Sequence, residues 1–274
     1  MDPDEKVRNP DDLAERLLPP EFWVFGLFTR DHARTREYIR AQRIGDYYMA
    51  NAMTWHIDGI LQDSAGNGVK QVVLVGAGLD SRPYRFAEKL SGVRFFEVDQ
   101  PATLDLKKKR VRAVFGSLPG HVTYVPFDYR SKPVLDSLSR AGFDPRWKTL
   151  FIWEGTSMLT DRDVVDETLR SIAQRAGSGS EVVFDYVFDA VVQGDFSKYR
   201  GARYDVARSS VKGEPWKFGI AEGEGAAFVT RRGFDVISDL GTRELAGRYL
   251  VKSDGSLDGE PTPYWRVAHA VVRE

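Results

Sequence analysis

One stretch, residues 71 to 101, constrains the fold more than any other part of the chain. It opens with a short apolar run, Val72-Val73-Leu74-Val75, breaks at Gly76-Ala77-Gly78, and closes with a second apolar run that ends at Asp99. Unbroken apolar strands are typical of the middle of a parallel sheet that is covered on both faces. The stretch therefore predicts a strand, a glycine turn, a helix and a second strand of a doubly wound α/β fold.

The same stretch predicts a ligand that contains adenosine. Glycines at the carboxyl end of a strand let the backbone approach a ligand more closely than a residue with a Cβ allows. Asp99 ends the next strand about 20 residues later, where a carboxylate accepts hydrogen bonds from a ribose diol. A strand, turn and helix that bind no ligand is the alternative.

The glycine pattern favours S-adenosylmethionine (SAM) over NAD. The dinucleotide fingerprint G-x-G-x-x-G lacks its third glycine, because Leu79-Asp80-Ser81 follows Gly78. A carboxylate at this helix start would repel a diphosphate, whereas the ammonium group in the methionine portion of SAM tolerates the charge of Asp80. SAM is therefore the predicted cofactor.

Four motifs follow one another between about residues 71 and 160. They read VVLVGAGLDSRPYRF, FFEVDQPATLDLKKKRV, VPFDYR and WEGTSMLT. In this order they resemble the leucine carboxyl methyltransferase family and its bacterial relatives, which include polyketide carboxyl and O-methyltransferases. The resemblance implies SAM-dependent transfer of a methyl group to a carboxylate or hydroxyl oxygen of a small molecule, of the natural-product or polyketide type.

The resemblance also implies a fold. It is the Rossmann-like fold of class I SAM methyltransferases, a seven-stranded, mostly parallel sheet with helices on both faces. An amino-terminal helical cap and a lid insertion after the fifth strand are expected with it.

The ends of four predicted strands bring one set of residues to a single edge of the sheet. Gly76 and Gly78, Asp99, Asp128 and Glu154 follow these strands, and the ligand crevice of an open parallel sheet lies at that edge. The resemblance adds that Asp128 contacts the adenine amino group and that the next residue lines the ring. The predicted cofactor-binding residues are Gly76, Ala77, Gly78, Asp80, Arg82, Asp99, Gln100, Phe127, Asp128, Tyr129 and Glu154.

Two positions depart from the family pattern. Met53 stands where relatives have an arginine that binds the cofactor's carboxylate, so Arg43 or Arg82 is expected to supply that cation. Leu159 stands where relatives have a tyrosine that contacts the substrate. The family's leucine-carboxylate substrate, and with it methylation of a phosphatase carboxyl terminus, is therefore not expected.

The expected reaction is direct displacement of the SAM methyl group by an oxygen nucleophile, so that the protein mainly aligns the substrates and excludes water. Arg130 matches the family position whose arginine helps to hold an acceptor carboxylate. A hydroxyl acceptor would need a base, for which the candidates are His32, His56, Tyr186 and Asp185. The predicted catalytic residues are Arg130, Tyr186 and His56.

The chain is expected to divide into an amino-terminal helical cap, residues 1 to 65, and a methyltransferase domain, residues 66 to 274. The cap could close over a substrate, or its helices could pack at the edge of the sheet. An insertion at about 189 to 224 is predicted to be the lid over the acceptor, with a flexible surface excursion as the alternative. The last two strands, 234 to 240 and 264 to 273, are expected to form an antiparallel pair.

Composition excludes several classes of function. The 274 residues contain no cysteine, which excludes disulfides, thiolate catalysis and Cys-ligated metals, and no metal-ligand spacing is present. A formal net charge of -1 predicts no nucleic-acid partner, and no apolar run approaches membrane-spanning length. The basic run 107 to 110 is interpreted as the solvated face of a helix. A cytoplasmic monomer or homodimer is expected.

Two functions of other classes stay open. A non-catalytic binding or scaffold protein could retain this fold, since Met53 replaces the expected arginine. An NAD-dependent oxidoreductase would share the sheet and Asp99, but Asp80 and the absent third glycine oppose it.

Overall fold

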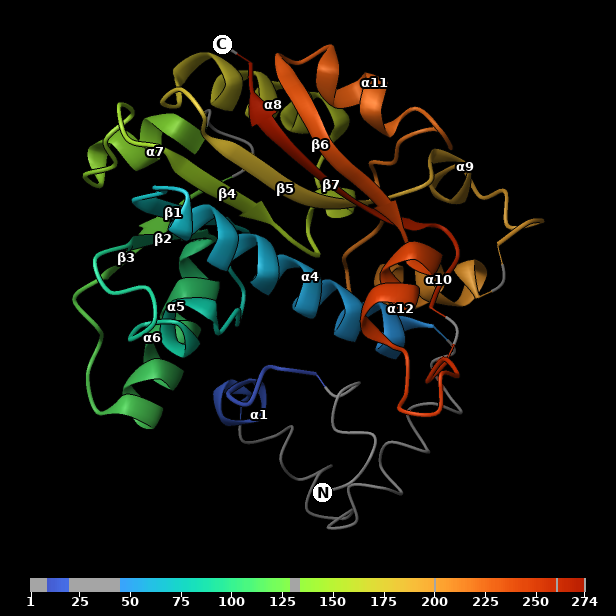
Figure 1. The fold of residues 1–274 in the computed structure, drawn as a ribbon, viewed down its shortest axis with the longest axis horizontal. Coiled ribbons are helices and arrows are strands. Elements are labelled where there is room, and N and C mark those ends of the chain that lie inside the picture. The colour runs from blue at the N-terminus through green and yellow to red at the C-terminus, as the bar shows by residue number, and fades with distance from the viewer. Residues whose placement is uncertain (1–8, 20–44, 129–133, 200, 260, 274) are drawn as a thin grey trace.

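A computed structural model describes residues 9–19, 45–128, 134–199, 201–259 and 261–273, and within them one seven-stranded sheet forms the centre (Figure 1). The strand order is β3-β2-β1-β4-β5-β7-β6. Strands β1 to β5 run parallel, and β7 runs antiparallel to both β5 and β6. The strands are β1 (Gln71–Val75), β2 (Arg94–Asp99), β3 (Val122–Pro126), β4 (Thr149–Trp153), β5 (Glu181–Val187), β6 (Phe234–Gly241) and β7 (Trp265–Val272). The predicted mostly parallel sheet is confirmed, including the antiparallel pair at its edge.

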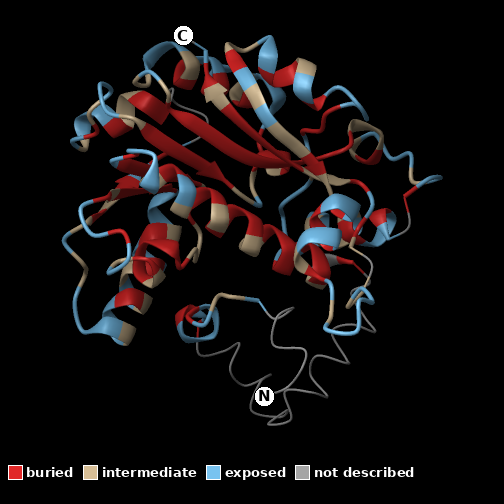
Figure 2. Ribbon diagram, viewed as in Figure 1, coloured by how far each residue is buried: buried red, intermediate tan, exposed pale blue. Residues whose placement is uncertain are grey.

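Burial along the strands follows their place in the sheet (Figure 2). Every residue of β1, β4 and β5 is buried, as expected for central strands that are covered on both faces. The edge strand β6 has mostly half-buried and exposed residues, and a register shift between Val236 and Ser238 interrupts its pairing with β7. Such a bulge at an edge strand hinders pairing with another chain.

Helices connect the strands and cover the sheet. They are α1 (Ala14–Leu17), α4 (Asp46–Gly66), α5 (Arg82–Arg85), α6 (Pro101–Phe115), α7 (Val134–Arg140), α8 (Arg162–Arg175), α9 (Asp189–Val192), α10 (Ala202–Val211), α11 (Gly225–Thr230) and α12 (Thr242–Tyr249). Pro101 begins α6, because proline lacks the N–H that the first helical turn leaves unpaired. The helix ends at Gly116, whose φ of +82° favours glycine.

Two hydrophobic cores lie on opposite faces of the sheet. Val72 and Leu74 of β1 belong to one core, whereas Val73 and Val75 belong to the other. Residues of α4, α5, α6 and α12 complete the first core, and residues of α7, α8 and α11 complete the second. The protein is therefore a three-layered α/β structure with helices on both faces.

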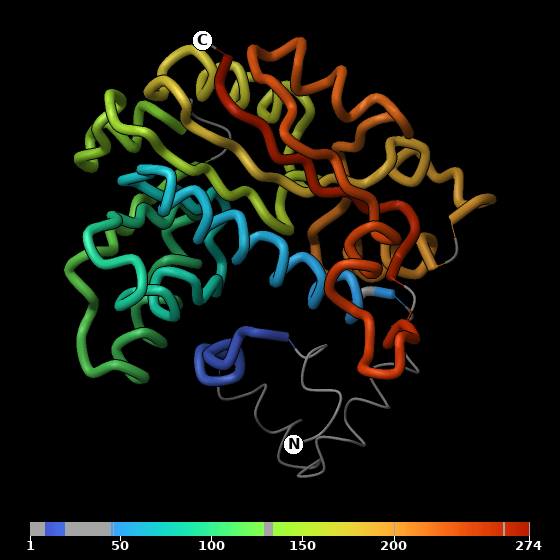
Figure 3. The backbone as a smooth tube through the Cα atoms, viewed as in Figure 1, coloured from blue at the N-terminus to red at the C-terminus, as the bar shows by residue number. Residues whose placement is uncertain are grey.

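The first core brings together parts of the chain that are far apart in sequence. Figure 3 shows α4, in light blue, beside α12, in orange, and the two helices are in contact. The sequence analysis did not predict α12, which lies between the last two strands. Much of the predicted cap, residues 1–8 and 20–44, lies outside the described residues, so its closure over a substrate remains a prediction.

The insertion after β5 has a small core of its own. It includes α9 and α10, and a third hydrophobic cluster contains Val191, Tyr199 and Ala202 from the insertion. These residues pack with Met158 and Tyr264, which lie next to the carboxyl end of β4 and the start of β7. The insertion is thus packed against the edge of the sheet where the predicted site lies.

Candidate functional site

The turn after β1 needs glycine at two positions, for different reasons. Gly76 has a φ of +73° and Gly78 a φ of +43°, both in the left-handed region. A Cβ on Gly76 would lie 2.3 Å from Thr156 Oγ1, whereas a Cβ on Gly78 would meet nothing closer than the Gly76 carbonyl oxygen, at 3.9 Å. The first glycine lets the turn pack against the segment after β4, and the second leaves open space.

Asp99, the last residue of β2, is directed at this turn. Its Oδ2 accepts a hydrogen bond from the Gly78 N–H and its Oδ1 accepts one from the Gln100 N–H, both at 2.7 Å. Each carboxylate oxygen keeps a further lone pair, which can accept a hydrogen bond from a diol. The predicted ribose acceptor is therefore held in place by two backbone donors.

The end of β3 lies beside the end of β2. Asp99 and Pro126 are partners in the register, so Phe127 and Asp128 follow at the same edge of the sheet. Phe127 is buried, and its N–H donates to the Asp99 carbonyl oxygen at 2.8 Å, while Asp128 is exposed. Four residues named in the sequence analysis lie outside the described residues: His32, Arg43, Tyr129 and Arg130.

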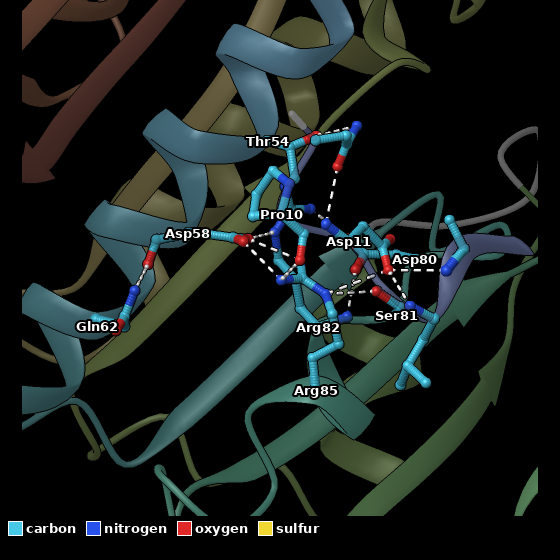
Figure 4. Close-up of polar contacts among 12 residues, drawn as sticks. Pro10, Asp11, Thr54, Asp58, Gln62, Asp80, Ser81, Arg82 and Arg85 are labelled. Carbon is cyan, nitrogen blue, oxygen red and sulfur yellow. Dashed lines mark hydrogen bonds and ion pairs between the residues drawn. The ribbon is translucent and has the colours of Figure 1, made fainter. Parts of the chain in front are cut away.

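A buried arginine, Arg82, joins three carboxylates, of which Figure 4 shows Asp58 and Asp80. The Nε of Arg82 donates to Asp58 Oδ1 at 2.8 Å, and its Nη1 donates to Asp80 Oδ2 and to Glu154 Oε2, both at 2.6 Å. Burial opposes ionisation of Asp80, but the charges of Arg82 and Lys107 and the hydrogen bonds from Arg82 together outweigh it and lower the pKa of Asp80. Burial raises the pKa of Glu154, despite the same arginine.

A second arginine, Arg85, shares one of these carboxylates. Its Nη1 lies 2.8 Å from Asp58 Oδ2, and its Nη2 lies 3.1 Å from Asp58 Oδ1. Its Nε donates to Ser81 Oγ at 2.7 Å and lies 3.4 Å from Asp11 Oδ1 (Figure 4). Asp58 is thereby held between two guanidinium groups, which tie α4 to α5 and to the segment before α1.

A cavity of about 320 Å³ opens between these elements. Six of the predicted cofactor-binding residues line it: Gly76, Ala77, Gly78, Asp80, Arg82 and Glu154. Four polar lining residues were not predicted: Asp11, Thr54, Arg85 and Thr156. Thr54 could have been found, because it follows the family's arginine position in the sequence.

Lys107 corrects the interpretation of the basic run as a solvated face. Its side chain is fully buried, because helical spacing places it on the same side of α6 as the buried Leu104 and Val111. Its Nζ lies 2.8 Å from Glu97 Oε1 and donates to the Ala77 carbonyl oxygen at 3.2 Å. Burial raises the pKa of Glu97 to about 7. Lys107 thus holds the backbone of the glycine turn through its hydrogen bond to Ala77.

Two predicted catalytic residues lie away from the cavity. His56 Nδ1 lies 3.0 Å from the Tyr249 hydroxyl, and burial lowers the pKa of this histidine to about 4. The Tyr186 hydroxyl donates to Asp239, with both carboxylate oxygens at 3.0 Å, and burial raises the pKa of this tyrosine above its usual range. The structure therefore does not bring either side chain to the site, because each faces a helix or strand that packs over it.

Asp185, the fourth candidate base, lies directly behind the site. Its Oδ1 accepts a hydrogen bond from the Gly155 N–H at 2.7 Å, and its Oδ2 accepts one from Trp265 Nε1 at 2.6 Å. Burial, together with the charge of Glu154, raises the pKa of Asp185 to about 7. The carboxylate holds these two donors in place and does not line the cavity of about 320 Å³.

A second cavity, of about 280 Å³, is lined by residues next in sequence to those that line the first. Met53 lines the second cavity and its neighbour Thr54 lines the first; likewise Gly155 lines the second, while Glu154 and Thr156 line the first. The residue at the family's arginine position therefore faces the second cavity. Leu159, at the family's tyrosine position, lines it as well.

Among the described residues, no group of three or more His, Cys, Asp or Glu side chains is placed to hold a metal ion. In the same part of the chain, no helix is both long and apolar enough to cross a membrane.

The sequence match between this chain and its curated relatives covers about half of the relatives' length. A protein of Bacillus subtilis named "Putative S-adenosyl-L-methionine-dependent methyltransferase YktD" is 31% identical over 162 residues, which cover 59% of this chain and 53% of that protein. A relative from Mycolicibacterium smegmatis with the same description is 29% identical over 220 residues, covering 78% of this chain and 64% of that protein. The chain spans about half the length of the first of these relatives.

Solved structures share the fold at low sequence identity. An O-methyltransferase family protein from Burkholderia thailandensis has a TM-score of 0.54 at 10% identity, covering 89% of this chain and 61% of that one. The CurJ carbon methyltransferase has a TM-score of 0.53 at 13% identity, covering 84% of this chain and 56% of that one. These similarities confirm the class I methyltransferase fold.

A family model described as leucine carboxyl methyltransferase matches residues 4–173. This match takes in the glycine turn, the arginine network and the ends of β2, β3 and β4. Because it covers more than half of the chain, the protein belongs to the leucine carboxyl methyltransferase family.

Proposed function

We propose that the protein is a SAM-dependent methyltransferase that moves a methyl group to an oxygen of a small molecule, of the natural-product or polyketide type. The observation that carries the proposal is a pair of cavities lined by the same two segments of the chain. Consecutive residues of α4 and of the segment after β4 line one cavity and then the other. A donor in the first cavity and an acceptor in the second would meet at this boundary.

The first cavity suits SAM in shape and charge. Open space at Gly78 and the fixed carboxylate of Asp99 fit an adenosine group. Four carboxylates surround Arg82 and Arg85, so the surplus charge is negative and favours the sulfonium and ammonium groups of SAM. They are Asp11, Asp58, Asp80 and Glu154. The predicted cofactor agrees with the family and with the names of the curated relatives.

The arginine network supplies a cation for the carboxylate of SAM in place of residue 53. Arg82 uses its Nε and Nη1 in the network, and Arg85 reaches the same cavity from the next helical turn. The hydroxyl of Thr54 also lines the cavity. A guanidinium group and a hydroxyl are suitable donors to a carboxylate.

In the proposed reaction, the protein mainly aligns the methyl donor with the acceptor oxygen. When bound, SAM supplies an activated methyl group on a sulfonium. The turn at Gly76 and Gly78 and the Asp99 carboxylate orient the adenosine portion, and Glu154 and Asp80 orient the ammonium group. The walls of the second cavity hold the acceptor oxygen against the boundary and exclude water.

Calorimetric titration with SAM, S-adenosylhomocysteine and NAD tests the proposal. We expect micromolar binding of the first two and no binding of NAD. Asp99→Asn keeps the shape of the side chain but loses the charge, and should weaken SAM binding by about tenfold or more. Asp105→Asn, an exposed position on α6, is the matched control and should bind normally.

The contrary outcomes are distinct. Binding of NAD instead of SAM would make the oxidoreductase alternative the better one. If no nucleotide binds, the protein is a non-catalytic member of the family, and the methyltransferase proposal fails.

A further inference from the structure

The walls of the second cavity are unusually rich in sulfur and aromatic rings. Its apolar lining residues are Met49, Met53, Met158, Leu159, Trp216 and Trp265. The two tryptophan rings lie edge to face, with centroids 5.5 Å apart and planes at 85°. Thioethers and indoles both contact aromatic rings favourably, and the flexible methionines adapt to their outline.

Charged residues of both signs line this cavity. Asp205 and Arg208 belong to α10, Lys212 is the residue that follows this helix, and Glu214 lies beyond it. The lining thus has two cations and two carboxylates, so it offers no surplus positive charge to an acceptor carboxylate, which would lose water without a net gain.

Asp205 is the buried ionisable group in the lining. Its side chain is 7% accessible, whereas Lys212 and Glu214 are exposed. The Tyr264 hydroxyl donates a hydrogen bond to Asp205 Oδ2. The Tyr264 ring packs against Trp216 and Trp265, with centroids 6.3 Å and 6.4 Å away. The carboxylate is thus fixed to the aromatic wall of the cavity.

We propose that the second cavity binds an uncharged aromatic compound through its hydroxyl-bearing ring, and that Asp205 accepts the hydroxyl proton during methyl transfer. This inference rests on the proposed methyltransferase function. The hydroxyl oxygen forms the new bond to the methyl carbon, and the carbon–sulfur bond breaks with its electron pair left on sulfur. The hydroxyl proton passes to the Asp205 carboxylate, so charge and atoms balance. A phenol, with a pKa of about 10, needs such a base near neutral pH.

A matched pair of acceptors tests the class of substrate. The full chain is incubated with SAM and either p-phenylphenol or p-phenylbenzoate, which share the same two rings, and formation of S-adenosylhomocysteine is measured. We expect turnover of the phenol and at least about tenfold less turnover of the benzoate. Preference for the benzoate, or turnover of neither while SAM binds, overturns the inference but leaves the cofactor site standing. Failure of SAM to bind overturns the proposed function itself.

A matched pair of variants tests the base. Asp205→Asn should lower kcat for the phenol by about 100-fold or more near neutral pH, with KM for the phenol within about threefold. The loss should shrink as the pH approaches the pKa of the phenol, because the ionised acceptor needs no base. Asp163→Asn changes an exposed carboxylate on α8 that lines neither cavity, and it should leave the pH profile unchanged.

A purely structural role for Asp205 predicts another result. The loss would then be the same at every pH, and Tyr264→Phe, which removes the hydrogen bond but no charge, would reproduce it. Either finding overturns the assignment of the base. SAM titration shows whether each variant keeps its cofactor site. If Asp205→Asn does not bind SAM, kcat of Tyr264→Phe is compared with that of the wild type across the same pH range. An unchanged kcat supports the assignment, and a loss that is equal at every pH overturns it.

Discussion

The two cavities differ in the residues that line them. The first is bounded by a glycine turn, strand ends and a network of two arginines and four carboxylates. The second is lined by methionine, leucine and tryptophan, together with four charged residues in and after α10. The first contains the residues that match the family motifs, and the second contains the two positions that depart from them, Met53 and Leu159. Under the proposed function, the difference teaches that the cofactor side depends on backbone geometry and fixed charge, and the acceptor side on the side chains that line the second cavity.

The largest effect on stability and on SAM binding is expected when the charge of Arg82, at the centre of the arginine network, is removed. Arg82→Met leaves Asp80 and Glu154 without their guanidinium partner, and breaking a buried ion pair from one side costs about 3–5 kcal/mol. We expect the free energy of unfolding to fall by about that amount in urea titrations, and SAM binding to weaken by more than about tenfold. Arg146→Met is the control, since its pair with Asp144 is exposed and screened by solvent, so its loss should leave the unfolding midpoint in urea unchanged. Loss of SAM binding without loss of stability would show that the network serves the ligand alone.

The boundary between the cavities should respond to pH through Asp185. Burial, with the charge of Glu154, raises its folded-state pKa from 3.8 to about 7. The stability that this group contributes is therefore complete below about pH 4, falls as the pH rises to about 7, and is constant above. One pKa unit corresponds to about 1.4 kcal/mol, so the fall amounts to about 4 kcal/mol.

Urea unfolding of the wild type and Asp185→Asn across this pH range checks the prediction. The variant should lose this part of the pH dependence, while Asp235→Asn, at an exposed position on β6, should retain it. Parallel curves for wild type and Asp185→Asn would mean that the carboxylate stays ionised when folded.

The glycine turn offers a sharper test, because its two costs can be separated. Gly76→Ala places a methyl group 2.3 Å from Thr156 Oγ1 and holds alanine at a positive φ. We expect a loss of about 2–3 kcal/mol, of which about 1–2 kcal/mol is the backbone term. Adding Thr156→Ala should recover only the steric part. Thermal unfolding of the single and double variants measures both, and full recovery would mean that the positive φ costs little.

The smallest effect on SAM binding is expected at position 53. Met53→Arg restores the family's residue, yet position 53 lines the second cavity, so the dissociation constant of SAM should change by less than about threefold. The acceptor KM should rise by about tenfold, because a cation is placed in an apolar wall. Met53→Leu, which conserves volume, is the control and should change neither. A marked gain in SAM affinity would contradict the separation of the cavities.

The cofactor side could largely be predicted from the sequence. Gly76, Gly78, Asp99 and Glu154 each follow an apolar run, and the carboxyl ends of parallel strands share one edge of a sheet. The partners of Arg82 could not be predicted, because Asp58 and Glu154 lie 24 and 72 positions away and reach it only through packing.

Other residues escaped prediction because their direction depends on helix rotation or on the insertion. The inward side of α6 is set by the sheet beneath it, so a run of four basic residues does not reveal that Lys107 is buried. His56 lies only a few residues from Thr54, but the 100° turn per residue carries it to the opposite neighbour, α12. Asp205 and Tyr264 meet only when the start of β7 and the insertion pack together.

The position of β7 inside the sheet also bears on how the protein is synthesised. Strands β5 and β6 are both complete many residues before β7, yet each takes β7 as its neighbour. While the chain is being made, β5 therefore presents an open edge until residues 265–272 emerge from the ribosome. Trp265 arrives with the same strand and closes the wall of the second cavity, so a nascent chain can shape its cofactor turn well before it can select an acceptor.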